Sequence, residues 1–199
     1  MQNPSLQCYE AAQSVLLYVA HTKHLTIRYS RTYSIPGCFN PCSSDIRRNG
    51  GLHAYSDSTW TAPKSICGYT VFRSGGPIAW SSRKLHIIAD STALAEYSAA
   101  SAASKELAFV RNMLYELDAA VHGPIVLAVD NKAAIKISEE RGVSKLTKHF
   151  DFAAHRIRDE VEHLRLRCHF VDTESQLADI FTKALGDYVF MRLRDKFFG

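Results

Sequence analysis

The chain has few cysteines, no long apolar run and no strong excess of charge of either sign. Its five cysteines among 199 residues are odd in number and scattered, which argues against a disulfide scaffold and favours a reducing compartment. No apolar run approaches the ~20 residues that a membrane-spanning helix needs. The first ten residues show neither a basic start nor an apolar core, so we expect no secretion signal and an intracellular protein.

The charge and the composition exclude disorder but leave the partner open. The net charge of +4 comes from 24 basic and 20 acidic residues, a smaller excess than a dedicated basic nucleic-acid-binding protein usually has. Charge therefore neither indicates nor excludes a nucleic-acid partner. The hydrophobic content of 46% suffices for a packed core. The length predicts one domain of about 100–150 residues with an additional segment.

The first 50 residues predict a separate segment followed by a linker. Apolar residues at three- and four-residue spacing predict a helix over 7–20, and residues 25–30 are typical of a short strand. Residues 31–50 carry several Pro-Gly, Asn-Pro and Asn-Gly turn signals, so we interpret them as a linker. Cys38 and Cys42 lie there, but no second Cys/His pair follows at zinc-finger spacing, and we expect no zinc site.

From residue 51 the pattern is that of an α/β domain. The five apolar residues at 125–129 are typical of a strand buried on both faces. A hairpin is predicted at Gly75-Gly76. The strands are predicted at 52–57, 66–74, 77–82, 125–129 and 164–171. The helices are predicted at 92–119, 131–140 and 151–163, with a last one that begins at a capping box over 173–176 and ends at Gly186.

Asp57 and Glu96 are the first two candidate site residues. Asp57 ends the first predicted strand of the domain, where the alternative is an ordinary turn residue. Glu96 shares a helix face with Ala93, Ala99 and Ala100, and such a face can approach a sheet closely. A carboxylate buried there is costly unless it is paired or bound to metal. The alternative is a glutamate on the helix surface.

Asp130 and Asp179 complete the set of acids. Asp130 directly follows 125–129, at a strand end of the kind where open α/β sheets bind ligands, although it could simply cap the next helix. Asp179 lies on the last predicted helix, where the alternative is an i,i+4 salt bridge to Lys183. Together the four acids favour oxygen ligands for hard divalent cations, as in two-metal hydrolysis of phosphodiesters.

Many short motifs follow one another in a specific order between residues 51 and 185. They include Tyr55-Ser56-Asp57 with Trp60, Ala95-Glu96-Tyr97, Asp130-Asn131, Thr147-Lys148-His149 and QLADIFTKAL at 176–185. In these motifs the chain closely resembles the ribonuclease H domain of copia-type LTR retrotransposon Pol polyproteins. Residues 11–22 resemble the end of the same family's reverse transcriptase, and residues 190–199 its C-terminal stretch.

The resemblance implies a fold, a reaction and a cofactor. The fold would be α/β, with a ribonuclease H-like mixed five-stranded sheet, helices on both faces and a short helical N-terminal segment. The chain would divide into a reverse transcriptase remnant (1–30), a linker (31–50), the ribonuclease H-like domain (51–185) and a C-terminal tail (186–199). The reaction would be hydrolysis of the RNA strand of RNA–DNA hybrids during reverse transcription. Two Mg²⁺ ions, for which Mn²⁺ could substitute, would be held by Asp57, Glu96, Asp130 and Asp179.

The resemblance also directs attention to auxiliary residues and partners. His149 is a further catalytic candidate, because cellular relatives often carry a histidine before the last helix and residues 172–175 contain none. Candidates for substrate binding, each with a solvated surface role as the alternative, are Lys64, Ser82, Arg83, Lys84, Asn131 and Lys148. We expect Trp80 in the core, and leave open whether Trp60 stacks on a base. The partners would be the hybrid and the reverse transcriptase region, in the cytoplasm or in virus-like particles and without a membrane.

Two function hypotheses remain. The presence of all four acids favours an active ribonuclease H. The chain has no Tyr-x-Asp-Asp pair, and Ala93 and Leu94 replace the Thr and Glu that the family often has before the long helix. These departures favour a catalytically silent remnant or an interaction module that keeps the fold.

Overall fold

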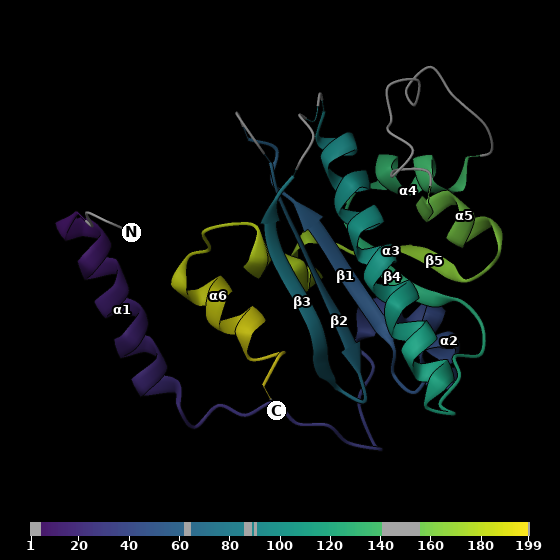
Figure 1. The fold of residues 1–199 in the computed structure, drawn as a ribbon, viewed down its shortest axis with the longest axis horizontal. Helices are drawn as coiled ribbons and strands as arrows, with labels where there is room; N and C mark the ends of the chain where they lie inside the picture. Colours follow the sequence, from purple (N-terminus) through teal and green to yellow (C-terminus); the bar gives the residue numbers. More distant parts are fainter. Residues whose placement is uncertain (1–4, 62–64, 86–88, 90, 141–155, 199) are drawn as a thin grey trace.

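The computed structural model describes residues 5–61, 65–85, 89, 91–140 and 156–198. Within them, a five-stranded mixed sheet carries helices on both faces, and a further helix precedes it (Figure 1). This architecture confirms the predicted α/β fold, with its mixed five-stranded sheet, helices on both faces and helical N-terminal segment.

The sheet is antiparallel on one side and parallel on the other. The strand order is β3-β2-β1-β4-β5, in which β1 pairs antiparallel with β2 and parallel with β4. The strands are β1 (His53–Ser58), β2 (Ile66–Arg73), β3 (Gly76–Lys84), β4 (Ile125–Val129) and β5 (Leu166–Phe170). The α-helices are α1 (Leu6–Thr22), α2 (Ser43–Arg48), α3 (Thr92–Glu116), α4 (Lys132–Glu139), α5 (Arg156–Glu162) and α6 (Asp187–Arg194). The 3-10 helices among the described residues are η1 (Gly37–Cys42), η3 (Thr173–Ser175) and η4 (Leu177–Phe181).

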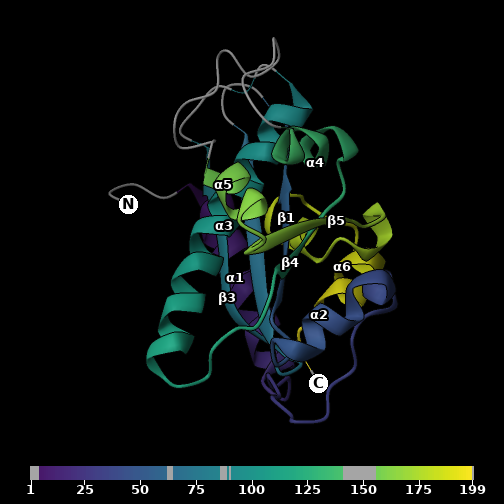
Figure 2. The same ribbon diagram turned by 90° about the vertical axis from the view of Figure 1, so that its right-hand side faces the viewer.

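Two apolar layers enclose the sheet. Along β4, Leu127 packs into the layer beneath α3, α4 and α5, whereas Val126 and Ala128 pack into the opposite layer with α2, η4 and α6. Figure 2 shows α3 on one side of the sheet and α2 and α6 on the other. Since neighbouring side chains of a strand point to opposite faces, the buried apolar run at 125–129 is the predicted strand covered on both sides.

The long helix α3 begins at a side-chain cap despite the departure of Ala93 and Leu94 from the family pattern. The Ser91 side chain accepts a hydrogen bond from the backbone N–H of Leu94 at 3.2 Å. Small side chains on the inner face of α3, among them Ala99 and Ala103, are fully buried. This close approach to the sheet places the N-terminal half of α3 against β1.

The segment predicted as a linker is folded against the sheet. Phe39 of η1 and Ile46 of α2 are completely buried and pack with Tyr55 and Val126. The turn residues of 31–50 are compatible with a 3-10 helix and a short α-helix, and the apolar residues between them fill the second layer. Leu193 and Phe197 of the predicted tail enter the same layer. The domain boundaries themselves stay a prediction.

Residues 5–30 contact the sheet sparsely. No residue of α1 is buried, and Figure 1 shows the helix set apart from the sheet beyond α6. The strand predicted at 25–30 does not form, because no β-ladder of the sheet includes this stretch. Its links to the hairpin are a backbone bond from Ser30 to Ser74 and the Tyr29 hydroxyl, which donates to the Pro77 carbonyl at 2.6 Å.

The last predicted helix is also different in the structure. Residues 173–181 form η3 and η4, and α6 begins only after Gly186. The break between η3 and η4 is at Gln176, which is extended and uses its side chain for bonds within the core. Separately, no helix in the described ranges is long and apolar enough to cross a membrane.

Candidate metal centre

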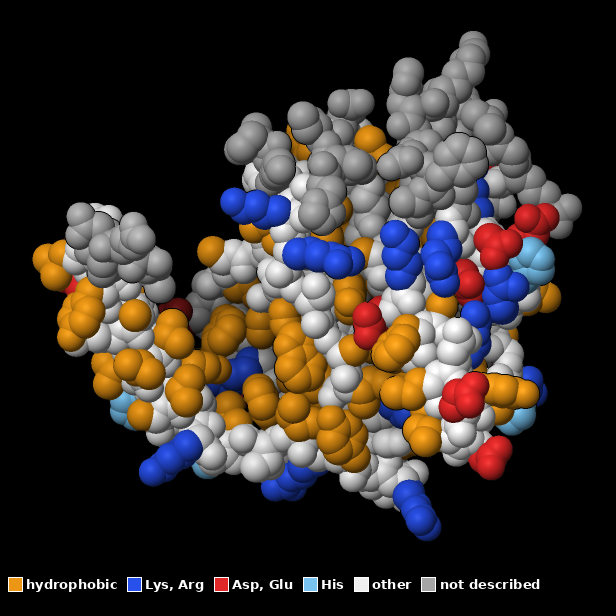
Figure 3. Space-filling view, in the orientation of Figure 1, with side chains coloured by type: hydrophobic (Ala, Val, Ile, Leu, Met, Phe, Trp, Pro, Cys, Tyr) orange, Lys and Arg blue, Asp and Glu red, His pale blue; other side chains and the backbone are white. Residues whose placement is uncertain are grey.

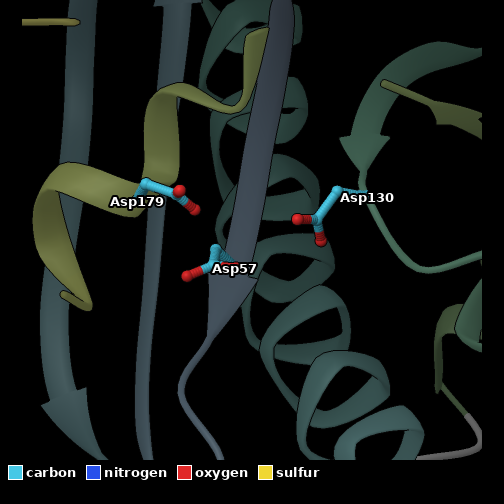
Figure 4. A group of neighbouring side chains, drawn as sticks. All are labelled: Asp57, Asp130 and Asp179. Carbon is cyan, nitrogen blue, oxygen red and sulfur yellow. The ribbon is translucent and has the colours of Figure 1, made fainter. Parts of the chain in front are cut away.

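Asp57, Asp130 and Asp179 meet at one rim of the sheet. One carboxylate oxygen of each lies within 4.8 Å of the others. Tyr55 of β1 pairs with Ala128 of the parallel strand β4. Asp57 and Asp130 each lie two residues beyond this pair, so both come to the same rim. Figure 4 shows Asp130 and Asp179 pointing toward β1 from either side of Asp57. The structure thus brings together three of the four predicted acids from three elements.

Asp57 is completely buried and has partners on the segment after η4. The Thr182 hydroxyl and the Lys183 ammonium both donate to its carboxylate, the latter at 3.2 Å. Gly68 lies opposite Asp57 in the β1–β2 ladder. A Cβ atom at Gly68 would lie 2.7 Å from Cβ of Phe181. The missing side chain therefore lets the end of η4 approach Asp57.

Asp179 is both a member of the acid cluster and the salt-bridge partner of Lys183, the two roles that the sequence left open. Its carboxylate belongs to the acid cluster and also accepts a hydrogen bond from Lys183 Nζ at 2.8 Å. Burial raises the pKa of Asp179 to about 6, with a further increase from Asp57 and Asp130 and an opposing decrease from Lys183. The salt bridge therefore only partly offsets the cost of placing this carboxylate among other acids.

Asp130 is not the cap of the helix that follows it. Asn131 caps α4, because its side-chain oxygen accepts a hydrogen bond from the backbone N–H of Ala134 at 3.0 Å. The side-chain partner of Asp130 is the Thr173 hydroxyl, at a long 3.5 Å. Burial, and then the charge of Asp57, raises the pKa of Asp130. Its carboxylate is therefore available to a ligand.

Glu96 points inward, as its alanine-lined helix face predicts, but lies outside the group of three. It is 6% exposed, and its Oε1 accepts a hydrogen bond from the backbone N–H of Ser58 at 3.2 Å. Its Oε2 is buried without a hydrogen-bond partner. Burial raises the pKa of Glu96 to about 9, and the charges of Asp57 and Asp130 add to the increase. Glu96 thus faces the same crowded negative region.

Gln176 positions the cluster, although nothing in its periodicity indicates such a role. It is completely buried, its Nε2 donates to the carbonyl of Ser56 at 2.9 Å, and its Oε1 accepts from the N–H of Ala178 at 3.2 Å. These bonds join η4 to β1 and so fix Asp179 beside Asp57. A sequence signal exists only in the motif QLAD, where the glutamine stands three residues before the acid.

The predicted substrate-binding residues fall into three groups. Ser82 and Asn131 already have partners, since the Ser82 hydroxyl donates to the Phe181 carbonyl at 2.6 Å and Asn131 caps α4. Arg83 and Lys84 are exposed at the end of β3. Figure 3 shows several Lys and Arg side chains across the upper half of this face of the molecule. Lys64 and Lys148 lie outside the described residues, as does the catalytic candidate His149.

The two tryptophans are both 56% exposed. The expectation that Trp80 lies in the core is wrong, because it lies on the edge strand β3, where its side chain lines an open pocket with Ile180 and Phe190. Trp60 lies just beyond β1, and its indole N–H donates to the Ala89 carbonyl at 2.8 Å. Trp60 therefore connects the exit of β1 with the approach to α3.

Comparison with known proteins relates the chain to transposons. No family model matches it. It is 30% identical over 200 residues to the retrovirus-related Pol polyprotein from transposon RE1 of Arabidopsis thaliana, covering 98% of this chain and 13% of the polyprotein. It is 34% identical over 149 residues to the corresponding polyprotein from transposon RE2, covering 73% of this chain and 10% of the polyprotein. Among solved structures, it is similar to RNase H1 from the archaeon Halobacterium salinarum, with a TM-score of 0.46, 19% identity, and coverage of 66% of this chain and 93% of that chain.

Proposed function

We propose that this chain, which belongs with the retrovirus-related Pol polyproteins of transposons and spans 13% of the length of one of them, hydrolyses the RNA strand of RNA–DNA hybrids. The observation that carries the proposal is the convergence of three acids at one rim of a ribonuclease H-like sheet: Asp57 of β1, Asp130 directly after β4, and Asp179 of η4. Glu96 of α3 lies close enough for the charges of Asp57 and Asp130 to raise its pKa.

The residues present fit divalent cations. The donors are carboxylate oxygens, which Mg²⁺ prefers, and Glu96 Oε2 is a buried oxygen without a partner. Burial and mutual repulsion raise the pKa values of Glu96, Asp130 and Asp179, so bound positive charge would stabilise all three carboxylates. We propose two Mg²⁺ ions, replaceable by Mn²⁺, which when bound activate water and stabilise the leaving oxygen of the phosphodiester.

The chain's own residues would hold this site rigid and guide the substrate. The bond from the Ser58 N–H orients Glu96, while bonds made by Gln176, Ser82 and Thr182 fix η4 against β1 and β3. Arg83 and Lys84 are exposed on β3 and suited to phosphate contact, which would make hybrid binding weaker at higher salt. Recognition of the RNA strand would require contact with its 2′-hydroxyls.

The test is cleavage of a labelled RNA–DNA hybrid with and without Mg²⁺. Asp130→Asn should abolish cleavage, because the charge is lost while Asn131 continues to cap α4. The matched control is Asp118→Asn, since Asp118 is exposed beyond the far end of α3 at a positive φ of 53° that asparagine tolerates. Equal cleavage by Asp130→Asn and the parent would refute the assignment.

One observation favours the silent remnant as a second candidate. Lys183 already pairs with Asp57 and Asp179, so part of the cluster can be neutralised within the chain. A remnant should cleave no hybrid, and Mg²⁺ should leave its melting temperature unchanged. An active enzyme should cleave and should melt at a higher temperature with Mg²⁺, because binding to the folded state stabilises it.

We further propose that residues 1–30 pack against the reverse transcriptase part of the same polyprotein. Apolar side chains of α1 such as Leu16, Leu17 and Val19 are more than half exposed. Co-expression with the reverse transcriptase polypeptide of the same polyprotein should yield a stable complex. Replacing Leu16 and Val19 with serine should abolish the complex and leave hybrid cleavage by the isolated chain unchanged. Unimpaired complex formation by that variant would contradict the proposal.

A further inference from the structure

Lys183 lies inside the acid cluster. Its ammonium is 3.2 Å from Asp57 Oδ1 and 2.8 Å from Asp179 Oδ1. The two carboxylate side chains are 1% and 7% exposed, whereas the lysine side chain is 33% exposed. Among the residues that the structure describes, Lys183 is the basic residue whose side chain forms ion pairs with the clustered aspartates. The positive charge therefore reaches the buried acids from the solvent side.

The ammonium competes with a metal ion for the same oxygens. A carboxylate oxygen that accepts a hydrogen bond from Lys183 is less available as a metal ligand, and the positive charge repels a cation a few ångströms away. The lysine has a route out, because its flexible four-carbon stem is partly exposed and follows η4. Asp57 and Asp179 can thus be neutralised by Lys183 or by a metal ion.

We propose that Lys183 is a built-in counter-cation that stabilises the metal-free chain and leaves the cluster when divalent cations bind. The inference rests on the proposed metal site and adds a device that sets its affinity. Lys183 weakens cation binding in the absence of substrate, so the ions would bind more readily when phosphates of the hybrid provide further ligands. Lys183 acts here as a positioning residue for charge and makes no bond in the reaction.

The test compares Lys183→Met with Lys136→Met in the full chain. Lys136 is 79% exposed and pairs only loosely with Glu140 at 4.0 Å, so its replacement makes the same change in net charge away from the cluster. Melting temperature is measured without metal and across a titration of Mg²⁺ or Mn²⁺. Without metal, Lys183→Met should melt several degrees below the parent and below Lys136→Met, because repulsion among the acids is uncovered.

The Mg²⁺ titration should show the opposite effect of the same substitution, because removing Lys183 strengthens cation binding. The Mg²⁺ midpoint, taken as the concentration that raises the melting temperature by a set amount, should fall by at least about tenfold in Lys183→Met, and the melting temperatures should converge at high Mg²⁺. Lys183→Arg keeps the charge and should behave like the parent in both measurements, which guards against a folding defect in the methionine variant. Lys136→Met should keep the parent's Mg²⁺ midpoint.

The outcomes separate this inference from the proposed function. If the parent and Lys183→Met respond to Mg²⁺ with the same midpoint, the counter-cation role is refuted and the metal site stands. If neither responds to Mg²⁺ or Mn²⁺, the metal site fails and the inference fails with it. If only Lys183→Met responds, the lysine blocks the site in the free chain, which supports the inference in its strongest form.

Discussion

Glu96 and Glu160 are two glutamates with the same 6% exposure and opposite surroundings. Burial tends to raise the pKa of Glu160, but hydrogen bonds from Arg111 and Arg165 outweigh it, and the pKa is lowered. Those bonds are 2.9 and 3.1 Å long. Glu96 has one backbone donor and faces other acids, so its pKa is raised to about 9. The charge of one buried carboxylate is balanced by arginines of the fold, and that of the other is not.

The largest expected effect is on activity at Glu96. Glu96→Gln should reduce Mg²⁺-dependent hybrid cleavage by at least about 100-fold, because a negative charge placed for the reaction is lost. Its metal-free melting temperature should stay the same or rise, since the change relieves repulsion from Asp57 and Asp130. Cleavage assays and thermal melting of the same preparation measure both. A variant that cleaves normally would show that Glu96 is as structural as Glu160.

Glu160→Gln should lower stability and leave hybrid cleavage nearly unchanged, the reverse of what we expect for Glu96→Gln. The loss of its charge weakens two bonds to partly exposed arginines and should lower the free energy of unfolding by about 1–3 kcal/mol. Cleavage per folded molecule should change little, because Glu160 lies on α5, away from the acid rim. Urea denaturation and a cleavage assay at low temperature check the two parts. A large loss of cleavage without a loss of stability would contradict the distinction.

A third buried group, His53, should make stability depend on pH. Burial lowers its pKa from 6.5 to about 4, with a smaller opposing effect of its bond to the Gly51 carbonyl. The unfolded chain therefore binds the proton first as pH falls, and stability decreases from pH 6.5 toward pH 4. The contribution should reach about 2 kcal/mol at pH 5.

The histidine contribution can be separated from that of the acids by a variant. Denaturation at several pH values gives the slope of the unfolding free energy against pH for the parent and for His53→Gln. Only the slope of the parent should include the contribution of the histidine. Identical slopes between pH 6.5 and pH 4.5 would mean that His53 is not desolvated as the structure indicates.

The smallest expected effect is at Ser82. Ser82→Ala removes the hydroxyl that donates to the Phe181 carbonyl and should cost about 0.5–1.5 kcal/mol. If Ser82 only holds η4, cleavage should decrease a few-fold with no change in the salt dependence of hybrid binding. If it contacts substrate, as the sequence predicts, hybrid affinity should decrease as well. Binding measured at two salt concentrations distinguishes these roles.

Local patterns predicted the parts of the molecule that depend on local chemistry. The apolar run at 125–129 identified β4 and with it the position of Asp130, and the alanines around Glu96 identified its inward face. The order of the short motifs between residues 51 and 185 predicted the fold and the family. The roles of the predicted site residues in catalysis stay predictions that the assays above test.

What the sequence did not reveal depends on contacts between distant segments. Gln176 bonds to a carbonyl 120 residues earlier, and no periodicity records that. The turn signals of 31–50 outweighed Phe39 and Ile46, whose burial needs the sheet as a partner. Trp80 has the sequence setting of a core strand residue, but β3 is an edge strand and its outer end is uncovered. The capping pattern at 173–176 predicted a helix that the core bonds of Gln176 interrupt.

The bond between Lys183 and Asp57 joins residues 126 positions apart. On a ribosome, β1 therefore emerges long before the segment that completes its acid rim. Pairings of such long range form slowly, since a large loop must close before the contact is made. An unfinished chain that ends before η4 contains Asp57 and Asp130 but lacks Asp179. We expect the proposed hybrid cleavage to appear only once the segment through Lys183 has been synthesised and has packed against a sheet that has already formed.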